Sequence, residues 1–230
     1  MGLREELERD VSKIFRDSWS TRDGYVVPES EDLKLGNDAV KLSATVLYAD
    51  MTASTKLVDG QSAAFAAEVY KAFLYCAAKI IRAEDGVITA YDGDRIMGVF
   101  VGDSKNTSAA RAALKINFAR VEVINPALKA VYTSSDYEVR HTVGIDTSDL
   151  FVARTGIRGS NDLVWVGRAA NYAAKLTDLP PEWQTRVTGD VYDAMNASMK
   201  TWEGRAVWEE RTWTDMNGMR IYRSAWRWQL

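Results

Sequence analysis

Apolar residues recur with two different periods along the chain. Between residues 62 and 82 they recur every three or four positions, at Phe65, Val69, Phe73, Ala77 and Ile80. This spacing predicts a helix with one buried face. The segment from 42 to 50 is instead almost continuously apolar and ends at Asp50, which predicts a buried strand. Apolar runs at 87–91 and 95–100 flank Asp92-Gly93 and predict a tight hairpin.

The second half of the chain repeats this alternation of periods. The pattern predicts a helix over 107–124 that ends at Asn125-Pro126, strands at 137–146, 150–153 and 163–166, an Ala-rich helix over 168–179, and a final hairpin within 205–228 around Asn217-Gly218. The resulting order predicts an α/β (α+β) fold with a ferredoxin-like βαββαβ core and a C-terminal β-hairpin. We expect a mostly antiparallel sheet flanked by helices, which pack on one face.

The first 40 residues have a different character. Leu3, Leu7, Val11, Ile14 and Phe15 lie at helical spacing among charged residues, so residues 1–18 are predicted to form an amphipathic helix that needs a partner surface. Residues 20–40 are polar and contain Gly and Pro, which predicts a lead-in loop. We therefore expect residues 1–40 to precede one globular domain over 41–230.

Composition narrows the possible chemistry. The 230 residues include 29 Lys and Arg against 32 Asp and Glu, a net charge of −3 that argues against nucleic-acid binding. The single Cys excludes an internal disulfide, and one Cys with one His cannot build a zinc site. Metal chemistry would therefore rest on carboxylates, which suit Mg²⁺ or Mn²⁺. Because no apolar run is long enough for a membrane span or a signal peptide, we expect a cytoplasmic protein without membrane attachment.

Two carboxylates are predicted to meet at one end of the sheet. Asp50 closes the first strand and Asp94 lies in the hairpin turn, beside that strand in a split βαβ sheet. Adjacent carboxylates repel unless a cation lies between them, so we expect a divalent-metal site. Such a pair can hold two ions that bridge a triphosphate and an attacking oxygen. Each Asp alone is more often a structural cap.

The segment after Asp50 suits a phosphate. It consists of small and hydroxyl-bearing residues around Met51, namely Thr52, Ala53, Ser54 and Thr55. Small side chains let backbone N–H groups approach phosphate oxygens closely.

Four segments resemble one known family in order and spacing. Residues 46–55 resemble the first-metal motif of class III nucleotidyl cyclases, and 91–100 their second-metal hairpin. Residues 143–146 resemble the next core strand, and 165–176 the helix that carries the family's Asn and Arg. The resemblance covers roughly 41–225, which identifies 41–230 as a nucleotidyl cyclase catalytic domain.

The resemblance implies conversion of a nucleoside triphosphate into a 3′,5′-cyclic monophosphate and pyrophosphate, with two Mg²⁺ or Mn²⁺ ions per site. It makes Asp50 and Asp94 the metal ligands, with the Met51 carbonyl as a further contact. Asn171 would orient the ribose, and Lys175 replaces the family's usual Arg. Their i,i+4 spacing places both on one helix face, which is alternatively a solvated stripe. The family further implies a homodimer with two shared sites.

The chain departs from the purine cyclases of this family where the base is recognised. Those enzymes commonly use a Lys and an Asp or Thr at the positions that Ala90 and Val164 occupy, and neither residue can hydrogen-bond a purine edge through its side chain. Tyr48 and Arg95 are expected near the base, and Tyr91 adds bulk that shortens the pocket.

These departures resemble the pyrimidine cyclases of bacterial anti-phage (Pycsar) systems, whose cyclic UMP or cyclic CMP is a signal for a separate effector. We favour UTP over CTP, because an Arg donates only and matches uracil's carbonyl oxygens.

Other functions stay open from the sequence. An adenylate or guanylate cyclase and a catalytically degenerate nucleotide-binding module share the same motifs. A diguanylate-cyclase-like enzyme would require a second acid where Arg95 stands. The family often places a triphosphate-binding Lys in the C-terminal hairpin. Asn217 occupies that place here, with Arg211 or Arg220 as possible substitutes.

Overall fold

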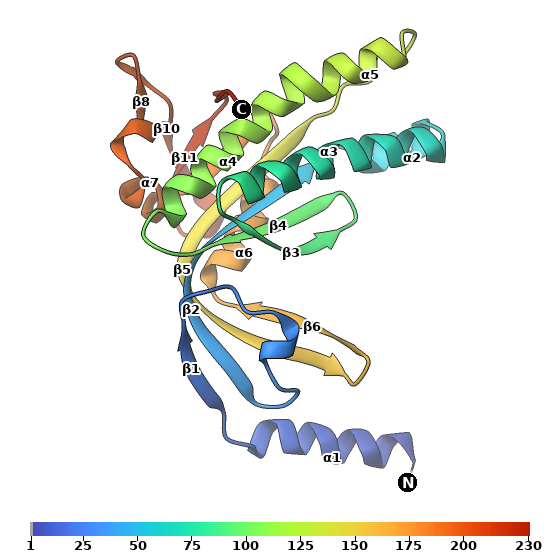
Figure 1. The fold of residues 1–230 in the computed structure, drawn as a ribbon, viewed down its shortest axis with the longest axis vertical. Coiled ribbons are helices and arrows are strands. Elements are labelled where there is room, and N and C mark those ends of the chain that lie inside the picture. Colours follow the sequence, from blue (N-terminus) through green and yellow to red (C-terminus); the bar gives the residue numbers. More distant parts are fainter. Residues whose placement is uncertain (1) are drawn as a thin grey trace. The chain divides into compact units, whose positions relative to one another are not determined.

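The computed structural model describes residues 2–230, which form two compact units (Figure 1). The larger unit comprises 44–148 and 168–230, and the smaller comprises the residues up to 43 together with 149–167. Strands β2 (Asp38–Met51) and β5 (His141–Ile157) each contribute residues to both units. The predicted domain boundary at residue 40 stays a prediction.

The larger unit is built on a sheet with strand order β10-β11-β7-β5-β2-β4-β3. The strands besides β2 and β5 are β3 (Val87–Asp92), β4 (Arg95–Phe100), β7 (Thr185–Thr188), β10 (Glu209–Trp213) and β11 (Met219–Ser224). The pairs β2–β4, β3–β4, β7–β11 and β10–β11 are antiparallel, whereas β5 and β7 are parallel. The predicted mixed fold, with a mostly antiparallel sheet and a C-terminal hairpin, is confirmed.

Helices flank this sheet. They are α2 (Ser54–Gly60), α3 (Ala63–Ala83), α4 (Lys105–Ala119), α5 (Asn125–Val131), α6 (Arg168–Thr177) and α7 (Gly189–Ala194). The helix predicted to end at Asn125-Pro126 instead continues through a π-helical turn (Arg120–Ile124) into α5, because Pro126 lies in the first turn of α5, where no backbone donor is needed. Short 3₁₀ turns (Ala197–Met199, Thr214–Met216) and the small pair β8 (Thr201–Trp202) and β9 (Arg205–Ala206) complete the unit.

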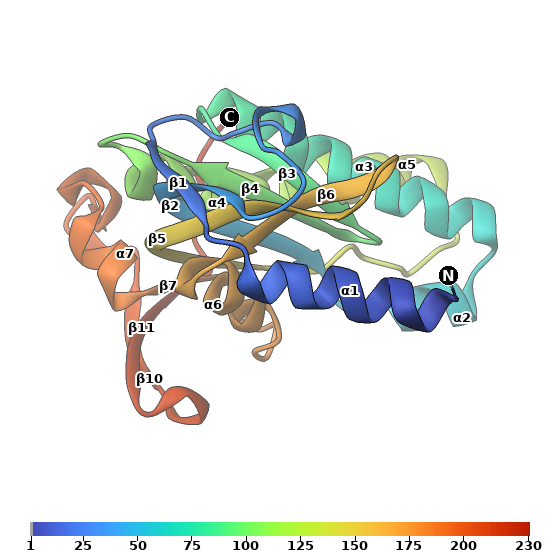
Figure 2. The ribbon, with the colours of Figure 1, turned by 90° about the horizontal axis from the view of Figure 1, so that it is seen from below.

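The helices do not all lie on one face of the sheet, so that expectation was wrong. Val143 and Ile145 of β5 pack in the main core with α3 and α4. Gly144 lies between them in β5, so its position faces the opposite side of the sheet. A Cβ added to Gly144 would lie 2.1 Å from the Ala173 carbonyl oxygen of α6. Figure 2 shows α3 and α6 on opposite sides of the strands. Alternation along β5 thus provides two apolar faces, and α6 packs tightly where the glycine removes a side chain.

The smaller unit is built from α1 (Leu3–Arg16), β1 (Ser20–Gly24), a 3₁₀ turn (Ser30–Asp32) and β6 (Ser160–Val166). The predicted N-terminal helix forms, and none of its residues is buried. The predicted lead-in loop contains β1, which pairs in parallel with β2 from Ser20↔Asp38 to Gly24↔Leu42. β6 pairs antiparallel with the end of β5. No described helix is long and apolar enough to cross a membrane.

One titratable group lies inside the main core. His141 is the chain's only histidine, and neither of its ring nitrogens has a hydrogen-bond partner. Its ring lies 5.6 Å from that of Phe73. Burial, with a smaller contribution from the Arg120 charge, lowers the pKa of His141 from 6.5 to about 3. The core therefore holds a neutral imidazole.

This burial predicts acid sensitivity. Below about pH 6.5 the unfolded chain binds a proton at His141 that the folded chain excludes, so the free energy of unfolding should fall with acid by up to about 1.4 kcal/mol per pH unit. Urea denaturation at pH 7 and pH 5 measures this fall. In His141→Phe the fall should be smaller. An identical fall in the variant and the wild-type chain would contradict the prediction.

Candidate active site

Asp50 and Arg95 face each other at one end of the sheet. They are directly opposed residues of the β2–β4 ladder. The Arg95 Nη2 donates to Asp50 Oδ2 at 2.8 Å, and both side chains are partly buried, at 18% exposure for Asp50 and 30% for Arg95. The guanidinium carbon of Arg95 also lies 5.8 Å from the centre of the Tyr48 ring. Asp50 is thus paired with an internal cation rather than with water alone.

Asp94 lies beside this pair, in the two-residue turn that joins β3 to β4. The turn is closed by Asp92↔Arg95, and Gly93 adopts φ +61°, a value that a glycine reaches without strain. One oxygen of the Asp94 carboxylate, Oδ2, is buried and has no hydrogen-bond partner. A buried carboxylate oxygen without a partner is costly and points to a missing ligand.

The two carboxylates influence each other. Burial raises the pKa of Asp50, and the negative charges of Asp94 and Asp178 raise it further, while Arg95 opposes them. Asp178 follows the last turn of α6, three residues after Lys175, and the sequence patterns did not mark it. Asp50 therefore takes up a proton more readily than an exposed Asp, mainly because burial disfavours the charged carboxylate.

The backbone after Asp50 turns sharply. Met51 ends β2 and is buried, and the Thr52 N–H donates to the Arg140 carbonyl at 2.9 Å. The Thr52 hydroxyl is buried without a partner. Ala53 adopts φ +60°, an uncommon conformation for a residue with a side chain, and α2 then begins at Ser54. Within three residues of Asp50, the chain thus has a buried hydroxyl without a partner at Thr52 and a left-handed backbone conformation at Ala53.

Strand register separates the aromatic residues that were expected near the base. Tyr48, Met97 and Ala90 are opposed across β2, β4 and β3, and therefore share one face with Asp50 and Arg95. Tyr91 is opposed to Ile96, a core residue on the other face, and is exposed. The structure brings Tyr48 and Arg95 together and places Tyr91 apart from them.

Helix α6 presents a polar stripe. Its buried residues are Ala169, Ala170, Ala173, Leu176 and Thr177. Asn171 and Lys175 are exposed on the opposite face, and the Lys175 Nζ lies 4.0 Å from Met216 Sδ. The polar pair is thus available to a ligand or to a second subunit.

Three further predicted residues lie elsewhere. Val164 is on β6 in the smaller unit, opposed to Ala153 and partly exposed. Arg211 forms an ion pair with Glu209, and Arg220 with Asp193, so each of these two guanidinium groups already has a carboxylate partner.

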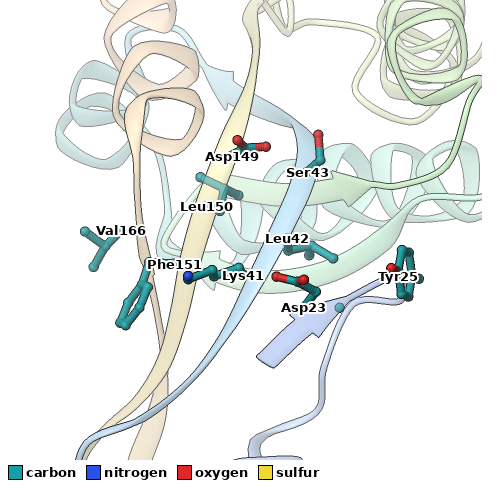
Figure 3. A pocket seen from close by; sticks show the side chains of 10 residues that line it. Asp23, Tyr25, Lys41, Leu42, Ser43, Asp149, Leu150, Phe151 and Val166 are labelled. Atoms are coloured by element: carbon teal, nitrogen blue, oxygen red, sulfur yellow. The ribbon is translucent and has the colours of Figure 1, made fainter. Parts of the chain in front are cut away.

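The smaller unit also has a pocket of about 490 Å³ (Figure 3). Its lining includes Asp23, Tyr25, Lys41 and Phe151. No residue of the predicted active site lines it. It is therefore not the site that the sequence motifs predict.

The residues at the sheet end fit a divalent cation. The unpartnered Asp94 oxygen and the neighbouring Asp50 carboxylate are the hard oxygen donors that Mg²⁺ and Mn²⁺ take. Within residues 2–230, no three or more His, Cys, Asp or Glu side chains gather in a metal-binding arrangement. A cation there would therefore complete its shell with backbone oxygen, phosphate oxygen or water.

Comparison with solved structures defines the class. A guanylyl cyclase, Cya2, superposes with a TM-score of 0.68 over 82% of this chain and 94% of its own, at 16% identity. A guanylate cyclase domain from Catenaria anguillulae in complex with GTP superposes with a TM-score of 0.62 over 82% and 99%, also at 16% identity. A dimeric guanylyl cyclase domain from Blastocladiella emersonii gives 0.62 over 82% and 99%, at 14% identity. The fold is that of a class III nucleotidyl cyclase, as the motifs indicated.

Sequence relatives define the family. No protein-family model matches the chain. A uridylate cyclase of Xanthomonas perforans is 52% identical over 231 residues that span both chains completely. A uridylate cyclase of Burkholderia cepacia is 50% identical over 232 residues, again over the full length of both. The chain belongs to the uridylate cyclase family and is a nucleotidyl cyclase.

The contact between Arg95 and Asp50 predicts competition with a cation. In Arg95→Gln no guanidinium occupies Asp50 Oδ2, so nucleotide-free protein should bind Mn²⁺ about two- to five-fold more tightly, in line with the modest strength of a partly exposed ion pair. Electron paramagnetic resonance titration of free Mn²⁺ measures the affinity. Asp50→Asn should weaken binding in the same titration. Unchanged or weaker binding in Arg95→Gln would contradict competition for the carboxylate.

Proposed function

We propose that this protein converts UTP into 3′,5′-cyclic UMP and pyrophosphate with two divalent cations. The observation that carries the proposal is the convergence of Asp50, Asp94 and Arg95 at one sheet end, with one Asp94 oxygen buried and unpartnered. The full-length similarity to proteins named uridylate cyclase supports the choice of substrate.

The reaction needs little chemistry from side chains. The ribose O3′ bonds to the α-phosphorus as the bond from that phosphorus to the bridging oxygen of pyrophosphate breaks, and the O3′ proton passes to solvent. Asp50 and Asp94, with the Met51 carbonyl, would hold Mg²⁺ or Mn²⁺, which when bound would lower the pKa of the 3′-hydroxyl and neutralise charge on the phosphates. The backbone around Thr52, Ser54 and Thr55 would approach the phosphates.

Tyr48 and Arg95 form the proposed base-recognition face. They share one face of the sheet with Ala90, which offers no side-chain hydrogen bond to a purine. A guanidinium only donates, which matches the carbonyl oxygens of uracil better than the exocyclic amine of cytosine. A face with no polar side chain at Ala90 and a guanidinium donor at Arg95 is the basis on which we favour UTP over CTP, ATP and GTP.

Asn171 and Lys175 are proposed to act on substrate held by a second subunit. Both are exposed on α6, on the face away from the core. Asn171 would orient the ribose, and Lys175 would stabilise charge on the transferring phosphate. Its ammonium group would act as a single positive charge, whereas the family's usual Arg can donate two parallel hydrogen bonds. A two-fold homodimer then has two equivalent sites. One structural neighbour is a guanylyl cyclase domain described as a non-canonical dimer, which supports dimerisation but not this particular arrangement.

The proposed biological role is a signal in bacterial anti-phage defence. Cyclic UMP would be released in the cytoplasm, where UTP is available, and bound by a separate effector protein. This proposal rests on the resemblance to pyrimidine cyclases, and it assigns no nucleic-acid or membrane partner to the chain.

Product analysis tests the activity. Purified protein with Mn²⁺ and each of the four ribonucleoside triphosphates should yield cyclic UMP as the main product by mass spectrometry. Asp50→Ala and Asp94→Ala should each lose activity by 100-fold or more, on the order of the loss of a main charge-stabilising group. Arg111→Met, which changes an ion pair on α4, is the folded control. Cyclic AMP or GMP as the main product would refute the base assignment, and no product would favour a nucleotide-binding module.

Subunit mixing tests the shared site. Asp50→Ala and Asn171→Ala are each expected to keep only a small residual activity as homodimers. After subunit exchange, mixed dimers carry one intact site of the two, and half the dimers in an equal mixture are mixed. The mixture should therefore regain about one quarter of wild-type activity. No recovery, with exchange verified by native mass spectrometry, would contradict sites built from two subunits.

A further inference from the structure

Asp146 is a fully buried carboxylate behind helix α6. It lies on β5, at 0% exposure. The Thr188 hydroxyl donates to its Oδ1 at 2.5 Å, and Arg168 donates to both oxygens, from Nε at 3.0 Å and from Nη2 at 3.3 Å. Burial raises the pKa of Asp146, whereas Thr188 and Arg168 oppose that rise. This carboxylate is therefore stabilised by one hydroxyl, one guanidinium and the backbone N–H of Thr147.

Arg168 is the first residue of α6 and ties it to two other elements, β5 and α7. Besides Asp146, its Nη2 donates to the Thr147 carbonyl at 2.8 Å and to the Asp190 carboxylate at the start of α7. The next backbone N–H, that of Ala169, donates to the Ser148 hydroxyl at 3.0 Å. The first turn of α6 is thereby held against β5 and α7. We call the contacts of Arg168 with Asp146, Thr147 and Asp190 the α6 clasp.

The clasp lies on the same stripe of α6 as the proposed catalytic residues. Arg168, Asn171 and Lys175 are spaced i, i+3 and i+7, which places them on one helix face. The buried face of α6, which includes Ala169, Ala173 and Leu176, packs closely against the sheet, where Gly144 leaves room for the Ala173 carbonyl. Apolar contacts of this kind are not directional. A forked guanidinium bonded to a buried carboxylate adds a directional restraint at the first turn of the helix, because its planar geometry fixes direction as well as distance.

A purely stabilising role does not explain the clasp well. Burying the Asp146 carboxylate carries a desolvation cost that an apolar side chain of the same size would avoid, whereas Arg168 stays 36% exposed. In some proteins such pairs fix one geometry rather than add stability, and here the geometry concerns the helix that carries Asn171 and Lys175.

We propose that Arg168 is a positioning residue of the cyclase, which holds α6 through Asp146 so that Asn171 and Lys175 meet the substrate in a fixed orientation. This inference rests on the proposed function of Asn171. It predicts that Arg168 acts on the chemical step through Asn171 rather than through overall stability.

A double-mutant cycle between Arg168 and Asn171 tests this. Arg168→Met should lower kcat for UTP about 10- to 100-fold, the loss expected when a reacting geometry is displaced by about an ångström, with KM changed much less. In the Asn171→Ala background the same change should lower the residual kcat by a clearly smaller factor than in the wild-type chain, because one of the two groups that Arg168 positions is already absent. Arg168→Lys, which keeps the charge but not the fork, should fall between Arg168→Met and wild type.

Two controls separate positioning from folding. Arg111→Met breaks one of the two ion pairs of the buried Glu84, which keeps Lys115, and should lower the melting temperature slightly without the loss in kcat. Because Arg168→Met leaves Asp146 unpaired, Asp146→Asn with Arg168→Met is the second variant. It should fold more stably than Arg168→Met and keep the low kcat. Hydrogen exchange should be faster in α6 of both Arg168 variants and unchanged there in Arg111→Met.

The outcomes distinguish a failure of the α6 clasp from a failure of the proposed cyclase function. Full activity in Arg168→Met, or an equal fold loss with and without Asn171, would overturn the clasp while leaving the proposed cyclase function intact. Full activity in Asn171→Ala would overturn the proposed role of Asn171 and this inference with it, and no cyclic product from wild type would overturn the proposed function itself.

Discussion

The site depends on the cost of placing two carboxylates together where water is partly excluded. The β2–β4 ladder brings Asp50 to the turn that holds Asp94, and the charges of Asp94 and Asp178 act on Asp50 across this space. Without a cation such a cluster disfavours ionisation. The chain supplies Arg95 as an internal cation on one oxygen of Asp50 and leaves one oxygen of Asp94 without any partner. Because Asp50 is paired with Arg95 and one Asp94 oxygen is unpaired, the site can still accept an external cation and a charged substrate.

Arg95 contacts both the proposed metal ligand Asp50 and the face proposed to bind the base. Its guanidinium pairs with Asp50 and also lies near the Tyr48 ring, on the face proposed to receive the base. If a base attracts Arg95, Asp50 becomes more available to a cation, and a bound cation likewise releases Arg95 toward a base. Such coupling is reciprocal by thermodynamic necessity. It would make assembly of the proposed metal site sensitive to the identity of the base.

The elements and the pair Asp50–Asp94 could be predicted from the chain because they rest on local signals. The β3–β4 turn needs a glycine at a positive φ, and Gly93 supplies it directly before Asp94. The Ala-rich stretch of α6 predicts a helix with Asn171 and Lys175 on one side. Other features had no local signal. The side of the sheet on which α6 packs follows from the single Gly144, and the strand β1 forms within a polar segment because β2 offers it an edge. Tyr91 lies apart from Tyr48 because register, not sequence distance, assigns faces.

The sequence by itself determined the periodic elements, the order in which they occur and the identity of the acids, because periodicity and turn chemistry act over a few residues. Only the tertiary structure decided which charges meet. Arg95 pairs with Asp50 across 45 positions, Arg168 with Asp146 across 22, and Asp178 acts on Asp50 from a different element. Electrostatic energy depends on distance and burial in space, and these are set by strand register and helix packing.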